Sequence, residues 1–143
     1  MKTPRDFHKY IHQQKESYKK FSPIFCKILN TTVYFNSRGF NHLRFNTNNS
    51  PRNRKEVLYK LNLLPYVRQV IQKAMHAHHL QRRSPIGGRK KSPIKEIAYY
   101  ALEHPCVVHN KKCVVKVIIR KIGDGKVHFW SVMHYKAPKN PKK

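Results

Sequence analysis

The last third of the chain holds the pattern that most limits the fold, which is two strand-like segments joined by a glycine-rich turn. Residues 113–122 (CVVKVIIRKI) and 127–135 (VHFWSVMHY) are rich in β-branched and aromatic side chains, which favour extended backbone. Asp124-Gly125 between them is typical of a two-residue type I′ turn. The pattern predicts an antiparallel hairpin, and residues 96–103 (EIAYYALE) are predicted to form a further strand.

The alternation of side chains along this hairpin predicts one buried and one open face. The expected pairs are Ile122–Val127, Arg120–Phe129, Ile118–Ser131 and Lys116–Met133. One face carries apolar side chains that suit packing on helices: Val115, Val117, Ile119, Trp130 and Val132, with Lys121 and His128 at its end. The other face carries Lys116, Ile118, Arg120, Phe129, Ser131 and Tyr135. Because burying unpaired Lys and Arg is costly, we predict that this second face is open and binds RNA phosphates and bases. An ordinary solvated sheet face is the alternative.

Two helices are predicted before these strands. Residues 6–20 have an amphipathic pattern and begin with Asp6, a residue type that caps helices. Residues 51–75 repeat apolar side chains every three or four positions after a Ser50-Pro51 pair, which is typical of a helix start. Pro65 lacks a backbone N–H, so we expect a kink there or two consecutive helices.

The remaining segments are interpreted as one strand, turns and loops. Residues 28–35 (ILNTTVYF) are predicted to form a strand, and residues 36–39 (NSRG) a turn. The histidines of residues 76–83 are expected to end the long helix, where cations suit the helix dipole. Residues 84–93 (SPIGGRKKSP) have the composition of a loop.

These elements predict an α+β fold in which N-terminal helices pack on one face of a twisted antiparallel β-sheet. We expect a single domain over residues 1–136 and a disordered basic tail over residues 137–143. No apolar run approaches the ~20 residues that span a bilayer, and the first residues have no secretory signal. Three cysteines, an odd number, argue against a disulfide framework. The expected location is therefore the cytoplasm, without a membrane partner.

The charge balance indicates a polyanionic partner. Lys and Arg number 31 against 6 Asp and Glu, which gives a formal net charge of +25. Self-repulsion makes such a chain harder to fold, and release of counterions from phosphates would drive its binding to nucleic acid. A nucleic-acid partner is favoured over an acidic membrane or protein surface.

The acidic residues limit the chemistry that this chain can use. The six carboxylates are scattered along the sequence, whereas a two-metal nuclease needs several of them to converge on hard cations. The sequence also lacks a P-loop or Rossmann glycine motif. Cleavage without metal needs the RNA 2′-OH as nucleophile, together with a general base, a general acid and cations on the phosphate. We therefore expect no metal and no small-molecule cofactor.

One cluster has the residue types of a zinc site, in the spacing His104, Cys106, His109 and Cys113. This spacing matches common zinc templates poorly. Because Cys113 begins an apolar run, a buried structural thiol is the simpler interpretation.

Several basic residues outside the hairpin are candidates for contacts with RNA. His42 in the segment FNHLRF is a candidate general base or acid with Arg44 on the phosphate, although a surface histidine beside a turn is an equal alternative. Arg68 lies among apolar neighbours of the long helix and either reaches the sheet or is solvated. Arg89, Lys90 and Lys91 of the 84–93 loop suit a phosphate backbone.

The order of these elements resembles the phage-type nucleases of the barnase–EndoU–colicin–RelE superfamily over residues 28–136. The resemblance rests on the segments VYF at 33–35, FNHLRF at 40–45, RNRKEVLYKLNLLPYVRQVI at 52–71 and VIIRKIGDGKVHFWSV at 117–132. It implies helices followed by a twisted antiparallel sheet whose open face holds a metal-independent RNase site. The matching positions are His42, Arg120 and Ser131. The N-terminal helix has no motif of the superfamily, and the strand before the long helix departs from its simplest element order.

The leading hypothesis is a metal-independent endoribonuclease of toxin or mobile-element type. In this hypothesis His42 is the general acid or base, and Arg120 and Lys116 bind the scissile phosphate. Ser131 or Tyr135 positions the phosphate or donates a proton. Phe129 stacks on a base. An acidic antitoxin or immunity protein is the partner protein that this hypothesis suggests. A non-catalytic RNA-binding protein, such as a ribosome-associated one, is the main alternative. A DNA-binding regulator is the third hypothesis, and the break at Pro65 argues against it.

Overall fold

The computed structural model describes residues 6–46, 50–85 and 94–136. The helices are α1 (Phe7–Lys19), α2 (Ser37–Arg44) and α3 (Arg54–Lys73). The strands are β1 (Ile24–Cys26), β2 (Thr31–Tyr34), β3 (His76–Pro85), β4 (Ile94–Val108), β5 (Lys111–Ile122) and β6 (Val127–Lys136).

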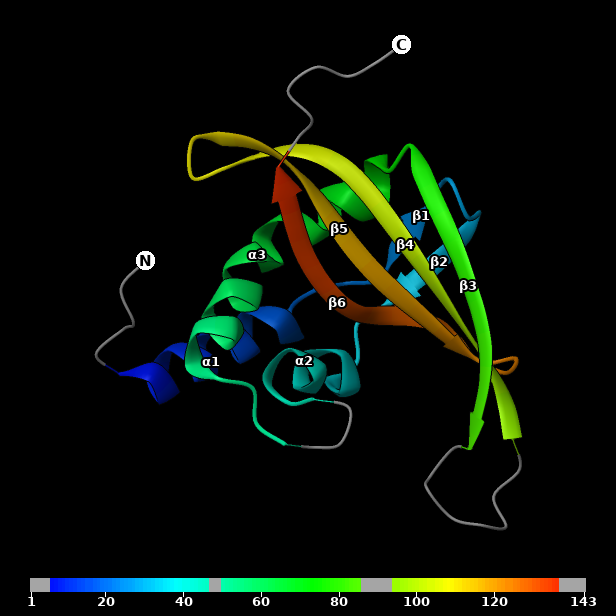
Figure 1. The fold of residues 1–143 in the computed structure, drawn as a ribbon, viewed down its shortest axis with the longest axis horizontal. Helices are drawn as coiled ribbons and strands as arrows, with labels where there is room; N and C mark the ends of the chain where they lie inside the picture. The colour runs from blue at the N-terminus through cyan, green and yellow to red at the C-terminus, as the bar shows by residue number, and fades with distance from the viewer. Residues whose placement is uncertain (1–5, 47–49, 86–93, 137–143) are drawn as a thin grey trace.

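The strands form one six-stranded, strongly twisted and curled sheet in the order β1-β2-β6-β5-β4-β3 (Figure 1). Neighbouring strands are antiparallel except β2 and β6, which pair in parallel, so the sheet is mixed. The long helix α3 contacts β1, β4, β5 and β6 and lies against one side of the sheet, with α1 beside it (Figure 1). The predicted α+β class with helices on one side of a twisted sheet is confirmed.

The core lies between α3 and the sheet face that carries the odd-numbered residues of β5. Val115, Val117 and Ile119 are fully buried there, as the alternation of the predicted hairpin required. α3 contributes a matching apolar stripe: Val57, Leu58, Leu61, Leu64, Val67, Val70 and Ile71. Because both stripes are continuous, the sequence pattern alone is enough to bring α3 onto this face.

Helix α3 begins later than predicted and is not interrupted. The prediction of a start at Ser50-Pro51 was wrong, since Asn53 caps the helix by accepting a hydrogen bond from the Glu56 N–H at 2.8 Å. The two consecutive helices that were one expectation at Pro65 do not form, because α3 is a single 20-residue helix that includes the proline. Pro65 lies on the exposed side of α3, so water can replace the backbone hydrogen bond that the proline cannot donate. The buried apolar stripe stabilises the helix on both sides of it.

Residues 36–45 were predicted to be a turn and a connection, and they form α2 instead. Asn36 caps this helix, accepting a hydrogen bond from the Gly39 N–H at 3.1 Å. The predicted strand over residues 28–35 is shorter in the structure, because only β2 is extended within it. Residues 27–30 form a turn that joins β2 to β1 in a short antiparallel hairpin.

Residues 76–83 were predicted to end a helix and are extended. They belong to β3, which pairs with β4 along ten residues from His76–Glu103 to Pro85–Ile94. β4 is correspondingly longer than predicted and includes Pro105, which lies beyond the end of β3 and is paired on one side only, with Val114 of β5. A proline is tolerated there because no ladder on its other side needs its N–H.

The turns also differ from the prediction. The type I′ turn joins β4 to β5, where His109 and Asn110 both have positive φ, of 50° and 65°. The β5–β6 connection is longer, and in it Gly123 rather than Asp124-Gly125 takes a positive φ. Most of the predicted 84–93 loop and the predicted tail at 137–143 lie outside the described residues. Among the described residues, none of the helices has the length and apolar character needed to cross a membrane.

Candidate active site

A β-bulge in β6 sets the positions of the site residues. Lys116 pairs with Met133 and Ile118 with Ser131, as predicted, but the register then shifts by one residue. Ile119 pairs with Phe129 and Arg120 with His128, so Trp130 is the extra residue of the bulge. The predicted Arg120–Phe129 pair was therefore wrong. The bulge shifts Phe129 and His128 by one position along β5, so each lies on the opposite face of the sheet from the one predicted.

The bulge exchanges the roles predicted for two aromatic residues. Phe129, predicted to stack on RNA bases, is fully buried against Tyr18 and Phe35 and belongs to the core. Trp130, predicted to lie in the core, is only partly buried and leaves the core face.

The Trp130 indole joins groups from two different elements. The Cζ of Arg120 on β5 lies 3.6 Å from the ring centroid, and the His42 ring of α2 stacks on the indole at 4.0 Å with an interplanar angle of 15°. Two groups this close to one ring would overlap if they shared a face, so the indole lies between them. Stacking and the cation–π contact therefore hold His42 and Arg120 on either side of one rigid ring.

Arg120 is itself held by buried neighbours. Only 8% of its surface is exposed, its Nε donates to His128 Nε2 at 3.3 Å, and it bonds to Tyr99, its partner on β4. Arg38 of α2 is exposed, and its positive charge helps to lower the pKa of both Arg120 and His128.

Arg52 binds the other edge of His42. Its Nε donates to the backbone carbonyl of His42 at 2.9 Å, and its Nη2 lies 3.3 Å from His42 Nε2. Its Nη1 donates to Glu56 Oε2 at 3.0 Å and to Asn46 Oδ1 at 3.2 Å. Arg52 thus ties the end of α2 to the start of α3 and places a guanidinium beside the imidazole.

Lys60 of α3 reaches the part of β6 that pairs with β5 on one edge but extends beyond β2 on the other. Its Nζ donates to Ser131 Oγ at 3.0 Å and to the carbonyl of Val132 at 3.2 Å, while only 6% of the residue is exposed. The residue before it, Tyr59, also contacts β6: its hydroxyl accepts from the His134 N–H at 2.7 Å and lies 3.3 Å from the His134 carbonyl. Side chains of α3 therefore satisfy backbone groups of β6 beyond its short pairing with β2.

Helix α2 approaches β6 so closely that one position needs glycine. A Cβ built on Gly39 would overlap the backbone carbonyl oxygen of Phe129 and lie 2.9 Å from Tyr18 Oη. Gly39 therefore has no room for a side chain, and this close contact sets the distance between His42 and Trp130.

The site is strongly basic and keeps its histidines neutral. Burial is the largest cause that lowers the pKa of His42 to about 4, and three neighbouring cations lower it further: Arg52, Lys60 and Arg120. The pKa of His128 is also lowered to about 4, first by burial and then by Arg120. Burial likewise lowers the pKa of Lys60. Burial and the cations make these imidazoles weaker proton acceptors, and the field of the cations favours an anion next to them. An anion bound there would raise the pKa of the imidazole and strengthen it as a base.

Three of the predicted catalytic residues lie in this one cluster, which we call the Trp130 site: His42, Arg120 and Ser131. Arg120 and Ser131 are buried rather than open to solvent, since the bulge turns this end of β6 toward α2 and α3. Tyr135, the fourth, is elsewhere, because it pairs with Val114 and Lys116 lies over its ring at 5.6 Å.

The predicted RNA-binding residues lie mostly away from the Trp130 site. Lys116 forms an ion pair with Glu103 at 3.7 Å, which offsets its charge. Arg68 donates to the Ser22 carbonyl at 3.3 Å, and the guanidinium of Arg44 lies over Phe45 at 5.0 Å. Arg89, Lys90 and Lys91 lie outside the described residues.

The cysteines and histidines of the zinc-like spacing do not converge. Cys106 and Cys113 face each other across β4 and β5 and are buried free thiols, whereas His109 is exposed in the turn. In the described part of the chain, no three His, Cys, Asp or Glu side chains are arranged to hold a metal ion.

Arg52, Lys60 and Arg38 were not predicted from the sequence as members of the Trp130 site, and His128 and Trp130 were predicted on the core face instead. Lys60 had a detectable signal in the sequence, because it lies one turn after Val57 on the apolar side of α3, where burying a lysine is costly unless it has a partner. Arg52 had none, since it lies in the connection before the helix. Comparison of the chain with protein-family profiles, curated proteins and solved structures found no match.

Proposed function

We propose that this protein is a metal-independent endoribonuclease that cleaves RNA by attack of the 2′-OH, with its active centre at the Trp130 site. The observation that carries the proposal is the neutral imidazole of His42, which is stacked on Trp130 and surrounded by Arg52, Lys60 and Arg120. This arrangement supplies a proton acceptor beside a binding site for a phosphate. It agrees with the resemblance to the barnase–EndoU–colicin–RelE superfamily.

In the proposed reaction, His42 takes the proton of the RNA 2′-OH. The 2′-oxygen attacks the adjacent phosphorus, the bond from phosphorus to the 5′-oxygen breaks, and a 2′,3′-cyclic phosphate remains. Arg52 and the exposed Arg38 stabilise the negative charge that develops on the phosphate oxygens. The phosphate enters beside His42 Nε2, in the place where Arg52 approaches it in the free protein.

The leaving 5′-oxygen needs a proton, and we assign its source to the pair formed by Lys60 and Ser131. The Lys60 ammonium donates to Ser131 Oγ at 3.0 Å, so the hydroxyl can pass a proton outward while taking one from the ammonium. The lowered pKa of Lys60 makes that transfer easier. Arg120 acts as a positioning residue, because its guanidinium is engaged with Trp130, His128 and Tyr99.

The test is incubation of the purified protein with a labelled oligoribonucleotide and with the same oligonucleotide carrying 2′-O-methyl groups. We expect cleavage of the first in excess chelator, with cyclic-phosphate ends, and no cleavage of the second. His42→Gln should lower the rate at least ~100-fold. His12→Gln, which changes an exposed histidine of α1, should leave the rate unchanged. Cleavage of the 2′-O-methyl substrate, or full activity of His42→Gln, would refute the proposal.

The second candidate is a non-catalytic RNA-binding protein. The observation in its favour is that Arg120 and Ser131 are almost fully buried and that both site histidines contact an arginine through Nε2. The same incubation separates the two functions, because tight, salt-dependent binding of RNA that stays intact supports the second.

A further inference from the structure

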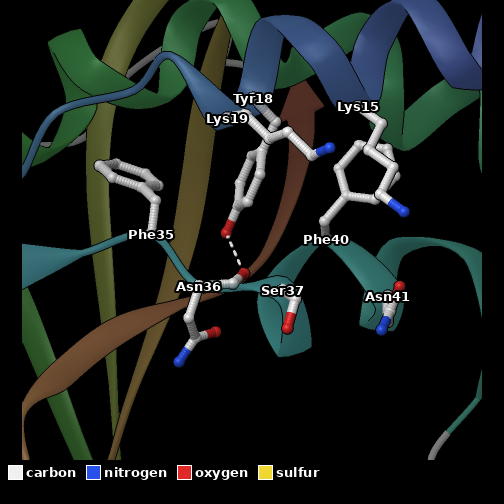
Figure 2. A pocket seen from close by; sticks show the side chains of 8 residues that line it. All are labelled: Lys15, Tyr18, Lys19, Phe35, Asn36, Ser37, Phe40 and Asn41. Carbon is white, nitrogen blue, oxygen red and sulfur yellow. Dashed lines mark hydrogen bonds between the residues drawn. The ribbon is translucent and has the colours of Figure 1, made fainter.

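A cavity lies between α1 and α2, on a face of α2 next to the one that carries His42. It measures about 200 Å³. Figure 2 shows the side chains of Lys15 and Lys19 of α1 close to the rings of Tyr18, Phe35 and Phe40, on the side of α1 that faces α2. Its lining residues are Lys15, Tyr18, Lys19, Phe35, Asn36, Ser37, Phe40 and Asn41.

The chemistry of this lining suits an anion joined to a flat ring. Lys15 and Lys19 are exposed ammonium groups at the rim. Glu16 pairs with Lys19 at 3.2 Å, but both partners are at least half exposed, and such surface pairs are weak enough for a phosphate to displace them. Tyr18 and Phe35 form an aromatic floor, in T-shaped contact at 5.9 Å.

The polar groups on the α2 side of the cavity are available to a ligand. Within the described residues, the side chains of Ser37 and Asn41 are exposed and have no hydrogen-bond partner. The amide of Asn41 can both donate and accept, so it can bind the edge of a nucleobase. A cavity of ~150 Å³ can hold a benzene ring, so this one has room for a single base.

The two sites lie on adjacent faces of one short helix. Successive residues of an α-helix are about 100° apart, which places Ser37 and Asn41 on one face and Arg38 and His42 on the next. The ridge between these faces is open, because Arg38 and Asn41 are both exposed. An extended chain that crosses this ridge would contact the cavity and the Trp130 site with neighbouring units.

We propose that this cavity is a second RNA subsite, which binds a nucleotide that lies beyond the two nucleosides joined by the scissile phosphate. The inference rests on the proposed function for the position of that phosphate, and it adds a requirement for substrate length. Lys15 and Lys19 bind the phosphate of this nucleotide, Asn41 contacts its base, and the aromatic floor lies under it. A single-stranded RNA of several nucleotides would therefore be bound better than a dinucleotide, which fills only the Trp130 site.

The experiment compares two double variants on two substrates. Lys15→Ala with Lys19→Ala removes the rim charges, and Lys9→Ala with Lys73→Ala removes two exposed lysines elsewhere. We expect the first pair to lower kcat/KM on a decaribonucleotide about tenfold and to leave that on a dinucleotide unchanged. The slope of log affinity against log salt for the decamer should also become shallower by about 0.7, since the two lysines together contact one phosphate and each phosphate contact to a single strand contributes ~0.7.

The outcomes separate the subsite from the catalytic proposal. Equal effects of the two double variants on decamer cleavage would overturn the subsite and leave the ribonuclease intact. If the protein binds the decamer without cutting it, the catalytic proposal fails, and the salt dependence of binding still tests the subsite. A slope reduced only in the Lys15 and Lys19 variant then supports the subsite, whereas equal slopes overturn it.

Discussion

Acid should unfold this protein through two histidines of the Trp130 site. His42 and His128 both have pKa values of about 4 in the folded protein, and a histidine in an unfolded chain titrates near 6.5. Between these values the unfolded chain binds protons that the folded chain does not. The stability that depends on these neutral imidazoles is therefore complete above pH 6.5 and is lost as the pH falls toward 4.

The size of the effect follows from the two pKa values. At pH 5 the unfolded state gains about 2 kcal/mol per histidine relative to the folded state. Only 7% of His128 is exposed and His42 is partly buried, so solvent screens the effect only in part. We expect a combined loss of roughly 2–4 kcal/mol between pH 7 and pH 5, which is a large part of the ~5–15 kcal/mol of a typical domain.

The assay is urea unfolding at pH 7 and at pH 5 for the wild type and for the double variant His42→Gln with His128→Gln. Glutamine is neutral at both pH values, so the loss between them should be roughly 2–4 kcal/mol smaller in the double variant. His12→Gln is the control and should behave like the wild type. If the wild type and the double variant lose the same free energy of unfolding, the two histidines are not the buried neutral groups that the structure describes.

Two further predictions concern helix packing, and each is measured by urea unfolding. Gly39→Ala should lower the free energy of unfolding by at least about 1–3 kcal/mol, because the added Cβ overlaps the backbone of β6 at Phe129. Ser37→Ala, on the exposed side of α2, is the control, and an unchanged free energy of unfolding in Gly39→Ala would contradict the contact. Pro65→Ala should raise the free energy of unfolding by about 1–3 kcal/mol, because it restores a hydrogen bond on the exposed side of α3 without changing the core. A free energy of unfolding below that of the wild type would show that α3 depends on the proline.

The parts of the fold that repeat regularly could be predicted from the sequence. The apolar stripe of α3 and the alternation Val115, Val117, Ile119 of β5 each identify a buried face without further information. The register of β5 and β6 was correct from Lys116 to Ile118 for the same reason. In each case the local pattern and the final burial agree, and such agreement makes a segment predictable.

The bulge at Trp130 could not be predicted from alternation. Phe129 and Trp130 are adjacent large aromatic residues, so either can occupy the core face. The choice is made by contacts from distant parts of the chain: α2 packs its glycine against the Phe129 carbonyl, and Lys60 binds the Val132 carbonyl. Because these partners lie more than 70 residues away, no local reading of the hairpin includes them.

Two other errors have the same physical origin. The segment Asn36 to Gly39 has the composition of a turn, but its glycine serves a close approach between α2 and β6 rather than a change in backbone direction. Residues 76–85 have no strong strand pattern of their own, and they are extended because ten residues of β4 pair with them. In both cases tertiary contacts override local preference.

The burial of cations at the Trp130 site is itself an argument for an anionic ligand. Lys60 and Arg120 are each more than nine-tenths buried, and the groups to which they donate are neutral: a hydroxyl, a backbone carbonyl and an imidazole. Removing such charges from water is unfavourable when no carboxylate is bonded to them, and apolar side chains at these positions would make a more stable core. A phosphate bound beside His42 would reverse this balance, because it supplies the missing negative charge and raises the pKa of the imidazole toward neutrality. The cluster therefore costs stability in the free protein and would be stabilised by a bound anion, which is the behaviour that the proposed function predicts for a site of binding and chemistry.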